Sequence, residues 1–261
     1  MLAKKFDPSK KSHDLTKYPW LVSEKMDGIR AVWNGTDFYT RNEKIVHAPA
    51  WFKAAMPRGK TYDGELFAGR GNFKRVSSTV RKLEPVDDEW KSIQYVVFDR
   101  PVEDGRPFRH VLEDLRREIV DTDRIRLAPQ RPVERLEDLM RLHDAAVAQG
   151  AEGLMLRRAD VGYVRKRSGA VLKVKAFSDA EARVVGHECG KGKYVGKLGS
   201  LICSMNGAVF GVGTGFSDEE RDEALFPIGT VVTVQFMEID ADSGRPRHPV
   251  FKGVRTDLLP R

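Results

Sequence analysis

The chain has 261 residues, of which 41% are hydrophobic and 32% charged, and its formal net charge at pH 7 is +7. This composition is typical of a globular protein with a substantial core, and no apolar stretch is long enough to span a bilayer. Two cysteines, Cys189 and Cys203, exclude a disulfide framework and a zinc site built from paired Cys motifs.

The positive charge is concentrated in the first two thirds of the chain. Residues 178–261 hold 10 Lys and Arg against 12 Asp and Glu, which leaves 35 against 26 in residues 1–177. A basic segment of this kind suits a polyanion or a nucleoside triphosphate. Residues 1–17 are polar and lysine-rich and lack the apolar core of a signal peptide. We therefore expect a cytoplasmic protein, or a periplasmic one if a signal peptide has been removed.

A lysine followed by an acid, a glycine and an arginine lies near the start of the chain, within residues 23–30. The run from Leu21 to Tyr39 alternates like a strand, and Asn34-Gly35 is typical of a two-residue hairpin turn. This pattern predicts that Lys25 lies at the base of an antiparallel hairpin, with Arg41 just past its return strand. A desolvated lysine, or one beside other cations, has a lowered pKa and becomes a nucleophile. A solvated turn is the other interpretation of this motif when it is taken alone.

The segment Tyr62–Phe67 predicts a strand with Asp63 and Glu65 on one face. Two acids on one face are unusual in a core strand, because a buried carboxylate needs a partner. A glycine-rich loop follows. It leads into a basic, hydroxyl-rich segment, residues 75–82, which suits phosphate contacts or a solvated helix face equally well.

The middle of the chain predicts alternating strands and helices. Residues 95–99 have the composition of a buried strand, and apolar residues at helical spacing predict amphipathic helices over 108–120 and 136–148. A short strand, residues 154–156, follows Glu152-Gly153. Residues 171–175 alternate so that Lys173 and Lys175 share one face. Two lysines placed together repel each other unless an anion lies between them, so this strand predicts an anion site or a solvated sheet edge.

The last 84 residues have a different sequence pattern, in which turn residues separate short strand candidates. Strands are predicted within residues 183–187, 200–205, 209–212 and 230–239, and a capping box, Ser217 with Glu220, predicts one helix. Short strands with a single helix fit a small closed barrel of the OB type. The loop Gly190–Lys197 suits backbone phosphates. We place the domain boundary between residues 177 and 178.

These motifs, taken in order, resemble those of ATP-dependent DNA ligases of the covalent nucleotidyltransferase superfamily. Lys25-Met26-Asp27-Gly28-Ile29-Arg30 is similar to the family's Lys-x-Asp-Gly-x-Arg motif. The further matches are Thr40-Arg41-Asn42, Asp63-Gly64-Glu65, Tyr95 to Asp99, Glu152-Gly153, Val171 to Lys175 and, more loosely, Pro249 to Asp257. With only about 20 residues before Lys25, the layout is closest to compact bacterial E-type or phage ligases.

The resemblance implies an α+β fold: an ATP-grasp-like nucleotidyltransferase domain of antiparallel sheets with flanking helices (residues 1–177), followed by an all-β OB-fold domain (residues 178–261). It implies that Lys25 attacks the α-phosphate of ATP to form lysyl-AMP. ATP and AMP are expected to contact Glu24, Arg30, Arg41, Glu65, Phe98, Lys173, Lys175 and Arg255. Mg²⁺, with Mn²⁺ as an alternative, is expected at Glu152 and Glu65.

The expected partner is nicked duplex DNA, bound by a monomer that does not associate with membranes. We expect the DNA to be held by basic residues of both domains, namely Arg70, Arg75, Arg167, Lys191, Lys193 and Lys197. An RNA ligase and an mRNA-capping guanylyltransferase use the same lysine chemistry and remain alternatives at this point. A catalytically silent nucleic-acid-binding protein with an OB module is the alternative from another class.

Overall fold

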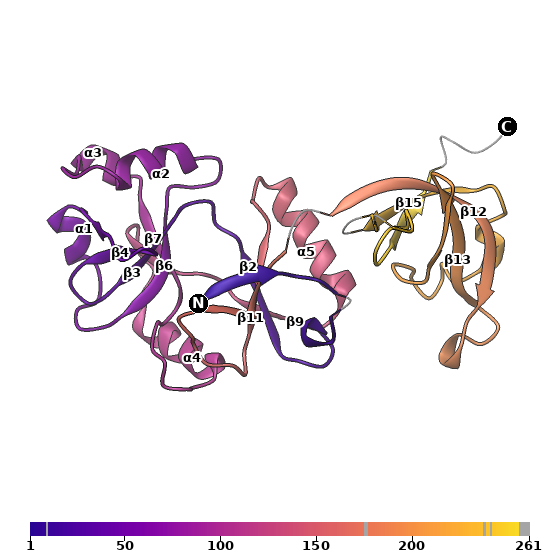
Figure 1. Cartoon of the computed structure of the whole chain (residues 1–261), viewed down its shortest axis with the longest axis horizontal. Coiled ribbons are helices and arrows are strands. Elements are labelled where there is room, and N and C mark those ends of the chain that lie inside the picture. The colour runs from indigo at the N-terminus through magenta and orange to yellow at the C-terminus, as the bar shows by residue number, and fades with distance from the viewer. Residues whose placement is uncertain (9, 175–176, 237–238, 241, 256–261) are drawn as a thin grey trace. The chain divides into compact units, whose positions relative to one another are not determined.

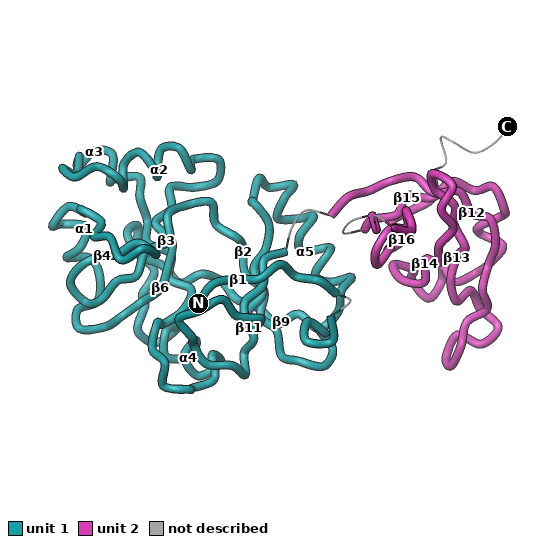
Figure 2. Tube along the Cα trace, in the orientation of Figure 1, with its two compact units in different colours: residues 1–174 teal, residues 175–261 magenta. Residues whose placement is uncertain are grey.

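The computed structural model describes residues 1–8, 10–174, 177–236, 239–240 and 242–255. The chain divides into two compact units, residues 1–174 and 175–261 (Figures 1 and 2). The division falls three residues before the boundary that the sequence predicts.

Unit 1 contains two mainly antiparallel sheets. The five-stranded sheet has the order β1-β11-β10-β2-β9, and the six-stranded sheet has the order β5-β4-β3-β6-β7-β8. The strands of the first sheet are β1 (Leu2–Lys5), β2 (Trp20–Glu24), β9 (Arg131–Val133), β10 (Leu154–Arg158) and β11 (Arg167–Val174). Those of the second are β3 (Ile29–Trp33), β4 (Phe38–Thr40), β5 (Ile45–Val46), β6 (Tyr62–Phe67), β7 (Gln94–Asp99) and β8 (Ile125–Leu127).

Helices cover these sheets with their apolar faces. They are α1 (Ala50–Ala54), α2 (Phe73–Val80), α3 (Asp87–Trp90), α4 (Phe108–Glu118) and α5 (Leu136–Ala148), with a 3-10 turn at Lys11–His13. The two helices predicted from apolar spacing are confirmed as α4 and α5. The main core lies between the six-stranded sheet and helices α1 to α4, where aromatic rings such as Trp33, Phe38 and Trp90 are buried. Burial of this apolar surface stabilises the sheet that presents β3, β6 and β7.

The hairpin between β3 and β4 is longer than the sequence predicts. Trp33 pairs with Phe38, so four residues form the loop instead of two. The side chain of Asn34 explains the difference, because its Oδ1 accepts hydrogen bonds from the backbone N–H groups of Thr36 (3.0 Å) and Asp37 (2.9 Å). This Asx-type turn competes with the tight two-residue turn.

Unit 2 is a five-stranded antiparallel sheet of order β14-β13-β12-β15-β16. Its strands are β12 (Ser178–Cys189), β13 (Leu198–Met205), β14 (Ala208–Val212), β15 (Val231–Phe236) and β16 (Val250–Val254). A bridge between Thr214 and Val250 joins the segment after β14 to β16, so the two edges of the sheet meet. This closure gives the small barrel expected from the sequence and protects its edges.

The helix predicted after Ser217 is wrong. The capping box itself forms: the Ser217 N–H donates to Glu220 (2.8 Å) and the Glu220 N–H donates to the Ser217 hydroxyl (3.1 Å). The carbonyl of Arg221, however, accepts a hydrogen bond from the N–H of Leu198 on β13 (3.1 Å). It is therefore not available for the hydrogen bond that a helix would need at this position. Only a 3-10 turn, Glu223–Leu225, follows. A helix this short is marginal, so one competing tertiary hydrogen bond prevents it.

Candidate functional site

Lys25 lies where the chain crosses from one sheet of unit 1 to the other. Strand β2 ends at Glu24 in the five-stranded sheet, and β3 begins at Ile29 in the six-stranded sheet. The prediction that Lys25 lies at the base of the β3–β4 hairpin is therefore wrong. The alternating pattern spans both strands, but it cannot show that they belong to different sheets.

The crossing segment is fixed at both ends. The N–H of Lys25 donates to the carbonyl of Gly153 (2.9 Å), beside β10. At Gly28 the backbone passes so close to β6 that a Cβ would lie 2.3 Å from the carbonyl oxygen of Leu66. Only glycine fits at that approach, which explains why a glycine follows the Lys-x-Asp sequence.

A pocket of about 390 Å³ opens at this crossing. The described residues that line it include six Lys or Arg side chains and four carboxylates. Among them are eight residues that the sequence predicts for nucleotide or DNA binding: Glu24, Lys25, Arg30, Arg41, Glu65, Phe98, Arg167 and Lys173. A concave site with an excess of cations suits an anionic ligand of nucleotide size.

Two carboxylates flank the amine of Lys25. Its Nζ forms an ion pair with Glu152, which lies two residues before the start of β10. Glu65 on β6 interacts electrostatically with Lys25 and accepts a hydrogen bond from the backbone of Gly28. Burial raises the pKa of Glu65 to about 8, although the charges of Lys25 and Arg30 oppose this shift.

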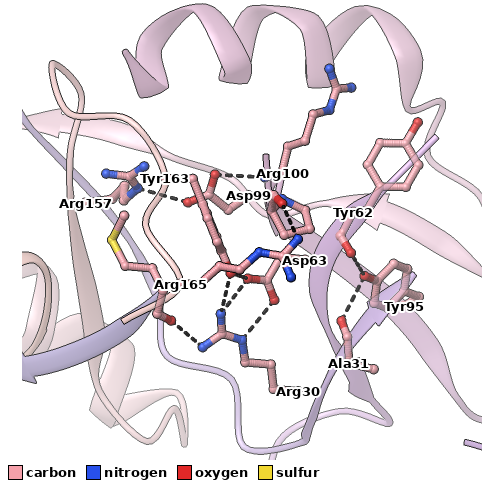
Figure 3. Close-up of polar contacts among 12 residues, drawn as sticks. Arg30, Ala31, Tyr62, Asp63, Tyr95, Asp99, Arg100, Arg157, Tyr163 and Arg165 are labelled. Carbon is pink, nitrogen blue, oxygen red and sulfur yellow. Dashed lines mark hydrogen bonds and ion pairs between the residues drawn. The ribbon is translucent and has the colours of Figure 1, made fainter. Parts of the chain in front are cut away.

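The floor of the pocket is a buried hydrogen-bonded network that joins β3, β6 and the segment before β11 (Figure 3). Asp63, with 0% of its side chain exposed, accepts from Arg30 Nε (2.9 Å) and from the Tyr163 hydroxyl (2.8 Å). Arg30 also donates to the Tyr163 oxygen (3.3 Å). Burial alone would lower the pKa of the Arg30 guanidinium, but Asp63 raises it overall. The partner that the sequence required for a buried acid on β6 is thus Arg30.

A second buried pair lies beside the first, as Figure 3 shows. Arg157 on β10 donates from Nε to Asp99 at the end of β7 (3.0 Å), and only 8% and 6% of these side chains are exposed. The guanidinium also lies 4.5 Å from the centre of the Phe108 ring. Burial raises the pKa of Asp99, while Arg157 acts in the opposite direction. The Arg157–Asp99 pair joins the two sheets beneath the pocket, whereas the Arg30–Asp63 pair lies within the six-stranded sheet.

Sequence reasoning missed Tyr163 and Arg157 as parts of the site. In the sequence, Arg157 is one of several cations that follow a short strand, and nothing in the spacing marks Tyr163. A signal was available for Arg157, because a charge that directly follows the apolar run Leu154–Leu156 in a buried strand needs a partner.

Phe98 forms one side of the pocket. It packs with Met26 and with the buried residues Phe67, Val96 and Ala128. The Arg30 guanidinium lies 5.6 Å from the centre of its ring. The ring is therefore an apolar surface inside a largely charged site.

Arg70, predicted for DNA binding, is engaged with a pocket residue. Its Nε and Nη2 donate to the two carboxylate oxygens of Glu24 (2.9 and 2.8 Å), and Nη1 donates to the carbonyl of Gln149 (2.9 Å). Hydrogen bonding to Arg70 lowers the pKa of Glu24. The structure thus joins two residues to which the sequence gives separate roles. The DNA-binding role of Arg70 stays a prediction.

The remaining predicted residues lie apart from these networks. Arg75 is exposed on α2, and Arg167 at the start of β11 donates to the carbonyl of Ala3 (2.6 Å). The loop between β12 and β13 in unit 2 carries Lys191, Lys193 and Lys197. Arg255, directly after β16, pairs with Glu181 within unit 2. Lys175 lies outside the described residues.

No cluster of three or more His, Cys, Asp or Glu among the described residues could hold a metal ion by itself. Glu152 and Glu65 flank Lys25 as separate acids. Mg²⁺ keeps several waters and uses one or two carboxylates together with substrate phosphates. This donor set therefore fits a metal that arrives with a triphosphate.

Comparisons with known proteins agree with this geometry. Residues 1–175 match the family model of the ATP dependent DNA ligase domain, and residues 189–255 match that of the DNA ligase OB-like domain. The DNA ligase of Haemophilus influenzae is 32% identical over 234 residues, which cover 89% of this chain and 85% of the relative. The DNA ligase of Archaeoglobus fulgidus is 28% identical, and the match covers 77% of this chain but 41% of the relative.

Solved structures give the same result. A structure from a study of DNA binding by Lig E DNA ligases has a TM-score of 0.60 at 36% identity and covers 98% of both chains. The Chlorella virus DNA ligase–adenylate has a TM-score of 0.57 at 25% identity and covers 97% of this chain and 98% of the other. In the part of the chain that is described, no helix has the length and apolar character needed to cross a membrane.

Proposed function

The chain belongs to the ATP-dependent DNA ligase family, and we propose on that basis that it seals nicks between a 5′-phosphate and a 3′-hydroxyl in duplex DNA through a lysyl-AMP intermediate. The observation that supports this most directly is the position of Lys25 at the pocket, at the crossing between the two sheets. A nucleophile fixed in this way meets a bound phosphate without a large loss of conformational freedom.

In the first step, the Lys25 amine attacks the α-phosphorus of ATP, a P–N bond forms, and the bond to pyrophosphate breaks. The amine must lose a proton before it attacks, and the carboxylate in contact with it is that of Glu152. In the second step, the 5′-phosphate of the nick attacks the lysyl-AMP phosphorus and lysine leaves. In the third step, the neighbouring 3′-hydroxyl attacks the 5′-phosphate and AMP leaves, which completes the phosphodiester.

The pocket offers a partner for each part of the nucleotide. Phe98 presents an apolar ring on which adenine can stack. All of Arg30, Arg41, Glu65 and Lys173 line the pocket. We expect the first three near the ribose and Lys173 at the α-phosphate. Lys175 and Arg255 stay predictions of the same kind.

Mg²⁺, when bound through Glu152 and Glu65, supplies neutralisation of the triphosphate and of pyrophosphate as it leaves. Both carboxylates interact with Lys25, so the residues that would hold the metal lie beside the nucleophile.

We infer that a monomer holds the DNA through basic residues of both units. Arg75 in unit 1 and the lysines of the β12–β13 loop in unit 2 are exposed. Contacts of this kind neutralise phosphates irrespective of sequence.

Labelling with ATP or GTP that carries a radioactive α-phosphate tests the proposal. We expect an acid-labile protein adduct with ATP but not with GTP, and we expect Lys25→Ala to abolish both the adduct and sealing. Lys25→Arg, which keeps the positive charge, should also fail. An adduct that survives in Lys25→Ala, or that forms only with GTP, would contradict the assignment. Nicks containing RNA should be sealed less well than all-DNA nicks.

A further inference from the structure

The loop that joins β12 to β13, residues 190–197, has a defined shape although it lies on the surface. Its base is closed by a hydrogen bond from the Gly190 N–H to the Lys197 carbonyl (2.8 Å). Within it, the Tyr194 N–H donates to Lys191 (3.2 Å), and the Lys197 N–H donates to Tyr194 (3.0 Å). The side chains of Lys191, Lys193 and Lys197 are exposed around this turn.

A buried arginine lies beneath the loop. Arg221 donates from Nη1 to the carbonyls of Leu198 and Gly199 (both 3.0 Å) and from Nη2 to the carbonyl of Gly213 (3.0 Å). Among the residues that the structure describes, no carboxylate forms an ion pair with this guanidinium. Burying a cation on neutral carbonyls is costly. The charge of Asp218 interacts with Arg221 without forming an ion pair with it, so part of the positive charge of Arg221 remains and adds to the potential of the loop.

Tyr194 connects the loop to this arginine. The centre of its ring lies 4.1 Å from Cζ of Arg221, and its hydroxyl donates to Asp218 (2.9 Å). Arg221 Cζ also lies 5.4 Å from the ring of Phe216, which stacks on Phe251 of the barrel core at 4.5 Å. A continuous chain of contacts thus runs from the core of the barrel to the middle of the lysine loop.

We infer that Arg221 and Tyr194 are positioning residues that hold the β12–β13 loop in one shape, so that its lysines meet the phosphates of duplex DNA together. The inference rests on the proposed DNA-sealing function. Long cationic side chains lose conformational freedom when they bind, and a loop that is already ordered loses less. The hydrogen bonds of Arg221 go to neutral carbonyls, while the carboxylate of Asp218 accepts from the Tyr194 hydroxyl beside the loop.

The experiment measures binding of the full chain to nicked duplex DNA with a non-reactive 3′ end, over a series of salt concentrations. Tyr194→Leu removes the ring and the hydroxyl, and we expect affinity to fall about fivefold with an unchanged slope of log K against log[salt]. Lys193→Ala should instead reduce that slope by about 0.9, because one phosphate contact is lost. Val195→Ala, in the same loop but with 75% of the residue exposed, is the matched control.

Two further measurements separate the outcomes. Gly196, at φ +78° with open space around it, strains the loop when replaced by alanine without affecting the barrel. Gly196→Ala should behave like Tyr194→Leu, so a folding defect of the latter does not decide the result. Lysyl-AMP formation without DNA should be unchanged in Tyr194→Leu, Val195→Ala and Gly196→Ala.

Wild-type affinity in both Tyr194→Leu and Gly196→Ala, together with weakened Lys193→Ala, would overturn the inference. If replacing all three lysines by alanine left DNA binding unchanged, the proposed contact of this loop with DNA would fail instead. A changed salt slope in Tyr194→Leu would assign the effect to lost phosphate contacts and would also contradict the positioning role.

Discussion

Unit 1 and unit 2 each bury arginine side chains, but they compensate the charge differently. Under the pocket of unit 1, Arg30 and Arg157 are each paired with a buried carboxylate. In the barrel of unit 2, the hydrogen bonds that Arg221 forms with described residues all go to carbonyl oxygens. The first arrangement pairs each arginine directly with an acid, whereas in the second the charge of Asp218 offsets Arg221 without a direct ion pair.

This difference separates two ways of binding an anion. In unit 1 the neutral floor leaves phosphate charge to cations such as Lys25, Arg41 and Lys173, so geometry and hydrogen bonding decide which ligand fits. In unit 2 the exposed loop and the charge beneath it act through a field that salt screens. Substitutions in unit 1 should therefore change stability and nucleotide binding, and those in unit 2 should change salt-dependent DNA binding.

The largest effect should come from removing one partner of a buried pair. Asp63→Ala leaves the Arg30 guanidinium without its carboxylate, and we expect the free energy of unfolding of unit 1 to fall by about 3–5 kcal/mol. All four tryptophans lie within residues 1–174, so tryptophan fluorescence during denaturation reports on unit 1 alone. Asp37→Ala, which removes a partly exposed pair with Lys53, should cost no more than about 1 kcal/mol. Equal small losses in both variants would show that the floor is not held by charge pairing.

A pH-dependent effect of intermediate size should come from Glu65. Its pKa is about 8 in the folded protein, against 4.5 for an unperturbed glutamate. Between pH 4.5 and pH 8, Glu65 is therefore protonated in the folded state and ionised in the unfolded state. Its contribution to stability is fully present below about pH 4.5 and is lost as the pH rises through 8. Glu65→Gln should remove this loss and raise the stability of unit 1 above pH 8 by an amount on the order of 3 kcal/mol. Denaturation of the wild type and of Glu65→Gln at pH 5 and pH 9 measures this gain in stability. A difference in unfolding free energy between the two proteins that is the same at both pH values would contradict the prediction.

A smaller effect should follow from Tyr163→Phe. The substitution removes the hydroxyl that donates to Asp63 and accepts from Arg30, so we expect a loss of about 1–2 kcal/mol in unit 1. The Michaelis constant for ATP in adduct formation should also rise if the network fixes Arg30 in the pocket. Tyr39→Phe in the same unit is the matched control and should change stability by less than about 0.5 kcal/mol. Loss of stability with an unchanged Michaelis constant would limit the network to a structural role.

The smallest effect should be a gain. The carboxylate of Asp218 lies 3.9 Å from the Lys193 amine, so Asp218→Asn removes a negative charge beside the loop and keeps an acceptor for the Tyr194 hydroxyl. Nicked-DNA binding should tighten about twofold at low salt and approach the wild-type value at high salt. Asp179→Asn makes the same charge change at the other end of β12 and should have less effect. Equal gains from both variants would point to net charge and not to the loop.

Much of the site could be predicted from the sequence because its chemistry resides in short segments. The Lys-x-Asp-Gly-x-Arg stretch, the acids of β6 and the ring of Phe98 each carry a local pattern, and the pocket brings these segments together. The strand and helix positions followed from the alternation and spacing of apolar residues, as α4 and α5 illustrate.

The sequence by itself therefore determined which residue types are available for nucleotidyl chemistry and which segments form strands. The tertiary structure alone decided that Lys25 lies between two sheets, that Arg70 pairs with Glu24, and that Arg157 and Tyr163 belong to the floor of the pocket. In the tertiary structure, a backbone hydrogen bond from Leu198 to Arg221 also forms where the sequence predicts a helix. The physical reason is the same in each case. Local propensities contribute little free energy compared with the cost of leaving a buried charged or polar group without a hydrogen-bond partner. That partner comes from a segment that is distant in the sequence, so only the tertiary structure supplies it.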